Sequence, residues 1–122
     1  MMAKGRVLVV DDEAFIREMV NDFLESDAIA CDSAATLTAA LENLAGNTYD
    51  LVLLDRNLDA SHGDDAVSCI RRIHPNVPVV IMTGDHQFGD TSIKRVGANG
   101  FIHKPFKYDE FMQTILQFLE PE

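Results

Sequence analysis

The sequence places polar residues able to do chemistry directly after four short apolar runs. These residues are two adjacent aspartates, a third aspartate, a threonine and a lysine: Asp11, Asp12, Asp55, Thr83 and Lys104. In an open parallel sheet the carboxyl ends of the strands meet at one edge, and ligands bind in the crevice beyond that edge. If the apolar runs are parallel strands, the five side chains therefore share one site.

Three carboxylates in one site repel each other, by roughly 3 kcal/mol for a pair at about 5 Å and an effective dielectric near 20. Mg²⁺ suits such a site because it prefers oxygen ligands from one or two carboxylates, water and phosphate. A carboxylate beside the metal is a competent nucleophile, so we predict that Asp55 accepts a phosphoryl group in line and becomes an acyl phosphate. The Thr83 hydroxyl and the Lys104 ammonium would each donate to a phosphoryl oxygen.

Each of these residues also has an ordinary structural explanation. Acidic residues at a helix start, such as Asp11 and Asp12, favour the positive end of the helix dipole. A threonine at a strand end often caps a turn, and a single lysine is usually a solvated surface charge. These explanations give no reason for Asp55, so we favour one shared site.

Composition points to a single domain in the cytoplasm. The 122 residues, 47% hydrophobic and 25% charged, are ordinary for a globular chain, and we expect residues 1–122 to form one domain. The net charge of −10 disfavours direct binding to nucleic acid. Cys31 and Cys69 lack metal-ligand spacing and are expected to be buried free thiols. The first apolar run, residues 7–10, is too short for a signal peptide or a membrane span.

Apolar patterns predict strands and helices in alternation. Continuous apolar runs predict strands covered on both faces, at residues 7–10, 51–54 and 77–82, and weaker patterns predict strands at 28–31 and 101–103. Helical spacing predicts helices over residues 15–24, 37–44, 66–73, 88–96 and 108–119. Thr36 is the expected N-cap of the second helix, and Phe15 is expected on the apolar face of the first. Five strands alternating with five helices predict an α/β fold with a doubly wound parallel sheet.

Over essentially its whole length the chain resembles the receiver domain of two-component response regulators. Asp11 and Asp12 fall on the acidic metal-binding pair of that family, and Asp55 falls on the phosphoacceptor. Asn57 falls on the residue whose backbone carbonyl binds Mg²⁺. The resemblance implies a flavodoxin-like fold with strand order 2-1-3-4-5 and a phosphoryl donor that is a histidine kinase or a phosphotransfer protein.

The same resemblance assigns the residues that report phosphorylation. Thr83 matches the switch hydroxyl, Phe101 the switch aromatic, and Lys104-Pro105 the lysine and proline whose peptide bond is typically cis. Phosphorylation would draw Thr83 to the phosphate and let Phe101 turn inward. That change would alter the surface made by the fourth helix, fifth strand and fifth helix, which signals to a downstream protein or to an output domain outside this chain. The domain is then a switch and not an enzyme with turnover.

Two other functions share part of this pattern. Phosphatases of the haloacid dehalogenase type also form an aspartyl phosphate. They typically use an aspartate two residues after the nucleophile as general acid, and this chain has Asn57 at that position. An amide cannot protonate a leaving group. A receiver-like module that is never phosphorylated would be expected to lack site residues, and here all of them are present. One departure is Asp59, where the family often has proline, and we interpret it as part of a solvated acidic loop.

Overall fold

The structure is a computed structural model, and it describes residues 5–58 and 63–119. Strands and helices alternate along these residues, as predicted. In chain order they are β1 (Arg6–Val10), α1 (Ala14–Glu25), β2 (Ala30–Ala34), α2 (Leu37–Gly46), β3 (Leu51–Asp55), α3 (Gly63–Ile73), β4 (Val79–Thr83), α4 (Asp90–Val96), β5 (Gly100–His103) and α5 (Tyr108–Leu119). Asp59 lies outside the described residues.

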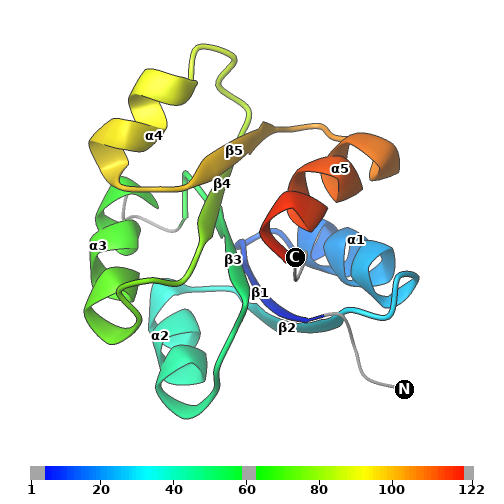
Figure 1. The fold of residues 1–122 in the computed structure, drawn as a ribbon, viewed down its shortest axis with the longest axis horizontal. Helices are drawn as coiled ribbons and strands as arrows, with labels where there is room; N and C mark the ends of the chain where they lie inside the picture. Colours follow the sequence, from blue (N-terminus) through cyan, green and yellow to red (C-terminus); the bar gives the residue numbers. More distant parts are fainter. Residues whose placement is uncertain (1–4, 59–62, 120–122) are drawn as a thin grey trace.

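The strands form one parallel sheet in the order β2-β1-β3-β4-β5. This order confirms the predicted doubly wound fold. Helices α1 and α5 cover one face of the sheet, and α2, α3 and α4 cover the other (Figure 1). The chain order reverses between β1 and β3, which places the crevice for a ligand at the carboxyl ends of these two strands.

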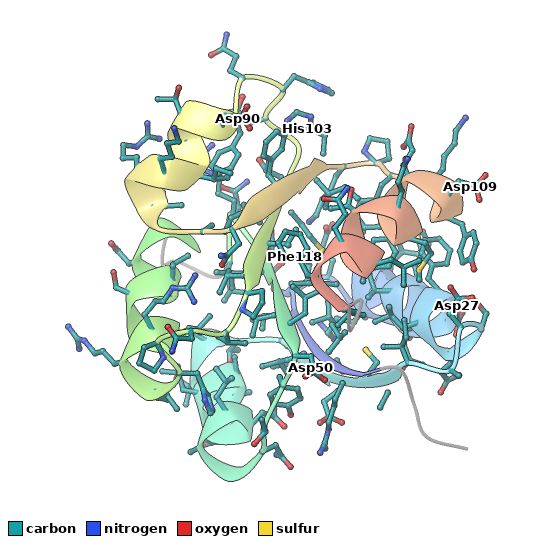
Figure 2. All side chains as sticks on the ribbon, viewed as in Figure 1. Asp27, Asp50, Asp90, His103, Asp109 and Phe118 are labelled. Atoms are coloured by element: carbon teal, nitrogen blue, oxygen red, sulfur yellow. The ribbon has the colours of Figure 1, made fainter. Side chains whose placement is uncertain are left out.

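The core consists of two layers separated by the sheet. Neighbouring residues of a strand point to opposite faces, so Val7 and Val9 pack with α1 and α5, while Leu8 and Val10 pack with α2 and α3. The α5 side of the sheet also carries Phe118, which Figure 2 shows between the helix and the strands. Residues of β3 and β4 are buried throughout, which explains their continuous apolar sequence.

The second strand begins two residues later than predicted and runs on to Ala34. Residues 26–28 instead close the end of α1: the Ile29 amide donates to the Leu24 carbonyl at 3.0 Å, and Ala28 has a φ of 61°. Because β2 lies at the edge of the sheet, most of its side chains remain at least partly accessible. An accessible edge strand lacks the continuous apolar pattern on which the prediction depended.

Several other element boundaries also differ from the prediction, the start of α3 by three residues, since that helix begins at Gly63. The fourth strand begins at Val79, after Pro78, which has no amide hydrogen to donate to a neighbouring strand. The fourth helix begins at Asp90, after Gly89 in an extended conformation. The N-cap prediction for α2 is confirmed, since the Thr36 hydroxyl accepts from the Ala39 amide at 3.1 Å.

Phe15 does not face the core, although it was expected to lie either in the core or at an interface. Its side chain is 72% exposed. The buried positions of α1 are Ile16, Val20 and Leu24, a row spaced by four residues, and Phe15 lies about 100° around the helix from Ile16. Cys31 and Cys69 are free thiols, as predicted, but both are only partly buried and not fully buried as expected. In the described part of the chain, no helix combines the length and apolar character that crossing a bilayer requires.

Candidate functional site

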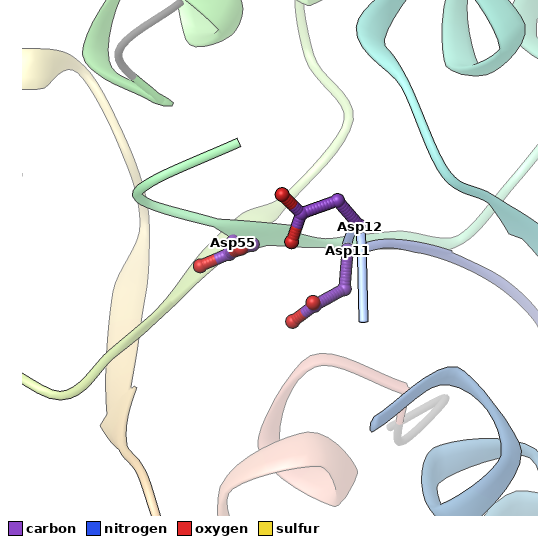
Figure 3. A group of neighbouring side chains, drawn as sticks. All are labelled: Asp11, Asp12 and Asp55. Atoms are coloured by element: carbon purple, nitrogen blue, oxygen red, sulfur yellow. The ribbon is translucent and has the colours of Figure 1, made fainter. Parts of the chain in front are cut away.

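Three carboxylates meet at the carboxyl ends of β1 and β3. Asp11 follows β1 directly and Asp55 is the last residue of β3, and the two strands pair in parallel with Val10 opposite Leu54. Carboxylate oxygens of Asp11, Asp12 and Asp55 lie within 4.8 Å of one another (Figure 3). Asp11 and Asp55 are buried, whereas Asp12 is exposed. The predicted convergence of these three residues is therefore present.

Lys104 connects the far end of the chain to this cluster. Its ammonium lies 2.8 Å from Asp11 Oδ2 and 3.3 Å from Asp55 Oδ1. Asp11 is held in turn by the Glu13 amide, which donates to its Oδ1 at 2.9 Å. One cation thus touches both buried carboxylates, so the site holds more negative than positive charge.

Burial and neighbouring charge shift the pKa values of this group. Burial raises the pKa of Asp55, and the charge of Asp11 raises it further, against the opposing effect of Lys104. Burial alone would lower the pKa of Lys104, but hydrogen bonds and charges from Asp11 and Asp55 outweigh it and raise the pKa. The Lys104 ammonium therefore stays charged, while Asp55 holds its proton more strongly than an exposed aspartate.

The donor set suits a hard divalent cation. Carboxylate oxygens are the ligands that such cations prefer, and the excess of negative charge in the cluster favours binding. Asp12 is exposed and leaves the cluster accessible from solvent. Asn57 lies two residues after Asp55. Its backbone amide donates to Asp55 Oδ1 at 3.2 Å, so the backbone of Asn57 lies next to the cluster.

Thr83 and Phe101 lie on the two strands at the other end of the sheet. Thr83 is the last residue of β4, is 1% exposed, and accepts the Asp85 amide on its hydroxyl at 3.0 Å. Phe101 of β5 is half-buried, and its ring lies 6.0 Å from that of Phe88. Phe101 therefore lies outside the acidic cluster. The Lys104–Pro105 peptide bond is cis, as the resemblance implied.

Sequence reasoning did not find several polar contacts around the site, among them the Arg17 guanidinium, which donates to the Asp11 carbonyl at 2.8 Å. The Glu13 carboxylate lies 3.7 Å from the Lys104 ammonium. Arg56 and Asp85 form an ion pair at 3.0 Å between the loops that follow β3 and β4. Arg56 and Asp85 stand at positions where the resemblance implies tuning of the phosphate lifetime, but nothing in the sequence indicates that they pair, because a contact between two loops leaves no periodic pattern.

Comparison with known proteins agrees with this geometry. The family model for the response regulator receiver domain matches residues 7–116. The transcriptional regulatory protein CutR of Streptomyces coelicolor is 35% identical over 114 residues, which are 90% of this chain and 51% of CutR. The chain thus spans about half the length of this relative.

Solved structures show the same similarity. The chemotaxis response regulator CheY4 of Vibrio cholerae is 28% identical with a TM-score of 0.87, over 98% of this chain and 100% of that one. NtrX of Brucella abortus is 32% identical with a TM-score of 0.87, over 96% of this chain and 27% of that one. With its doubly wound sheet and its acidic cluster at the strand ends, the chain belongs to the receiver domains of two-component response regulators.

Proposed function

We propose that this receiver domain accepts a phosphoryl group on Asp55 from a phosphohistidine of a histidine kinase or a phosphotransfer protein. The supporting observation is the arrangement of Asp55 beside Asp11, Asp12 and the Lys104 ammonium. Asp11, Asp12, Asp55 and the backbone carbonyl of Asn57 would hold Mg²⁺. When bound, Mg²⁺ neutralises phosphoryl oxygens and so lowers the barrier to attack by a carboxylate.

The transfer itself uses groups of the chain. An Asp55 carboxylate oxygen forms a bond to phosphorus while the bond from phosphorus to the donor imidazole nitrogen breaks, and the imidazole keeps that electron pair and takes up a proton. Lys104 is placed to donate to a phosphoryl oxygen because its ammonium already lies 3.3 Å from Asp55. Thr83 would donate to another oxygen once its hydroxyl turns toward the phosphoryl group.

The domain then acts as a switch whose output is a changed surface. Movement of Thr83 would let Phe101 turn inward and alter the α4-β5-α5 face, which a downstream protein or a further domain reads. A phosphatase function is not supported, because Asn57 stands where an acid would be needed to protonate a leaving group. A partnership with a kinase of this kind places the domain in the cytoplasm.

The test is incubation with acetyl phosphate and Mg²⁺ followed by intact-mass measurement. We expect one added phosphoryl group, and none when EDTA replaces Mg²⁺. Asp55→Asn should abolish the addition, whereas Asp22→Asn, an equal change at an exposed position of α1, should leave it unchanged. Labelling that survives Asp55→Asn would refute the assignment.

A further inference from the structure

Arg56, the residue directly after Asp55, contacts the loop between β4 and α4 at two points. Its guanidinium pairs with the Asp85 carboxylate at 3.0 Å and lies 4.8 Å from the centre of the Phe88 ring. Its backbone amide donates to the Met82 carbonyl at 2.9 Å. A single side chain in the loop after β3 thus connects that loop to the loop between β4 and α4.

The residues that Arg56 contacts also connect to the two switch positions. The Asp85 amide donates to the Thr83 hydroxyl at 3.0 Å. Phe88 is 2% exposed, and its ring packs edge-on against that of Phe101. The Phe88 carbonyl lies 2.9 Å from His103 Nε2, and Figure 2 shows His103 beside this loop. The position of the loop is therefore coupled to both Thr83 and Phe101.

Movement of Thr83 toward a phosphoryl group would disturb these contacts. The Thr83 hydroxyl would lose its present position relative to the Asp85 amide, and a shift of Asp85 or Phe88 would pull each away from the Arg56 guanidinium. Contacts made only in the resting arrangement stabilise that arrangement and oppose the change.

We propose that Arg56 is a positioning residue that, together with Asp85 and Phe88, forms a clasp holding the β4–α4 loop in its resting position. The clasp sets how much of the unphosphorylated domain adopts the signalling conformation. This inference rests on the proposed function for its consequence, but the clasp itself is a property of the ligand-free domain.

The expected effect follows from the exposure of the pair. The Arg56 and Asp85 side chains are 25% and 48% exposed, and such an ion pair and a cation–π contact are each weak alone. Acting together, they should change the population of the signalling conformation by about three- to tenfold. Apparent affinity for a ligand of that conformation rises by the same factor when the clasp is broken.

The probe is beryllofluoride with Mg²⁺, titrated while the amide resonances of Thr83 and Phe101 are followed by NMR. Arg56→Gln and Asp85→Asn should both tighten binding about three- to tenfold, because each breaks the clasp. If these residues acted only through their charge near an anionic ligand, the two variants would shift affinity in opposite directions. The double variant should match Arg56→Gln, because that change already removes the ion pair that Asp85→Asn breaks as well as the contact with the Phe88 ring.

Two further variants separate positioning from a general effect. Arg56→Lys keeps the charge, so its affinity for beryllofluoride should lie between that of the wild type and the tighter affinity of Arg56→Gln. Arg72→Gln is the same loss of charge at an exposed position of α3, and it should bind as the wild type does. Opposite shifts for Arg56→Gln and Asp85→Asn, or no shift in either, would overturn the proposal.

A second readout needs no ligand. In ligand-free protein, the Thr83 and Phe101 resonances should move in both clasp variants toward their positions in the beryllofluoride complex, and stay in place in Arg72→Gln. Failure of the wild-type protein to bind beryllofluoride would contradict the proposed function alone. The clasp is then tested by the Thr83 and Phe101 resonances of the ligand-free protein. A change of these resonances in both clasp variants, but not in Arg72→Gln, supports the clasp. Unchanged resonances in the clasp variants overturn it.

Discussion

The ammonium of Lys104 lies 2.8 Å from a carboxylate oxygen of Asp11, although 93 residues separate them in the chain. Lys104 follows β5 at one edge of the sheet, and Asp11 follows β1 near its centre. The contact thus spans β3 and β4. It holds the loop after β5 against the acidic cluster and offsets part of the repulsion between Asp11 and Asp55.

Replacing Lys104 should destabilise the metal-free domain. Lys104→Met leaves the buried Asp11 and Asp55 carboxylates without their cation, and we expect the free energy of unfolding to fall by about 1 to 3 kcal/mol. Urea denaturation at pH 7 measures the change. Added Mg²⁺ should restore part of the loss. Lys107→Met, at an exposed neighbouring position, is the control, and equal stability of the two variants would contradict this role.

Asp55→Asn should stabilise the metal-free domain near neutral pH, by about 1 kcal/mol, by removing one buried like charge. The pKa of Asp55 is raised by burial and by Asp11. The Asp55 carboxyl of the folded domain therefore stays protonated at pH values where the unfolded chain has lost this proton. As the pH rises through that range, Asp55 lowers the free energy of unfolding. The advantage of Asp55→Asn should be present at pH 7 and disappear at low pH, where Asp55 is protonated in both states. Urea denaturation at several pH values would contradict this if the difference grew on acidification.

Arg71 should be important for the stability of the α3–β4 and α4–β5 junctions. Its guanidinium donates to the carbonyls of Val77 and Gly97 and, at 2.7 Å, to Asn99 Oδ1. Burial lowers the pKa of Arg71 because it removes water from the guanidinium. The hydrogen bonds of the guanidinium compensate for that lost hydration. We expect Arg71→Met to lower the free energy of unfolding by about 1 to 2 kcal/mol because it removes the hydrogen bonds to the Val77 and Gly97 carbonyls and to Asn99 Oδ1. Arg72→Met is the matched control, and a similar loss in both variants would refute the role.

Cys31 should react slowly with alkylating reagents in the folded protein. Burial, followed by the charges of Asp32 and Glu25, raises the pKa of its thiol to about 12. Because the thiolate is the reactive form, the alkylation rate at pH 8 should fall by about a thousandfold relative to the urea-unfolded chain. Mass spectrometry of a Cys69→Ser variant treated with iodoacetamide measures both rates. Similar rates in the folded and unfolded states would contradict the raised pKa of the partly buried Cys31 thiol.

The position of the site could be predicted because it depends on simple rules. Buried parallel strands have continuous apolar sequences, and polar residues at their carboxyl ends converge in any doubly wound sheet. Asp11 and Asp55 needed no knowledge of loops to be placed together. The apolar runs 7–10 and 51–54 matched the cores of β1 and β3 for the same reason.

The remaining features depend on contacts that leave no pattern in the sequence. The edge strand β2 alternates too weakly to show its register, and the exposure of Phe15 follows from how α1 is rotated against the sheet. The Arg56–Asp85 pair joins two loops that are 29 residues apart. Such a pair is determined by the distance between loop backbones, which only the three-dimensional fold defines.

The central claim is that Asp55 carries the phosphoryl group, and direct mapping of the modified residue tests it most closely. Borohydride reduces an acyl phosphate to an alcohol and so converts a phosphorylated aspartate to homoserine. After treatment with acetyl phosphate, Mg²⁺ and borohydride, peptide fragmentation should find homoserine at position 55 alone. Homoserine at Asp11 or Asp12, or its absence from position 55 in a sample whose intact mass shows a phosphoryl group, would contradict the account.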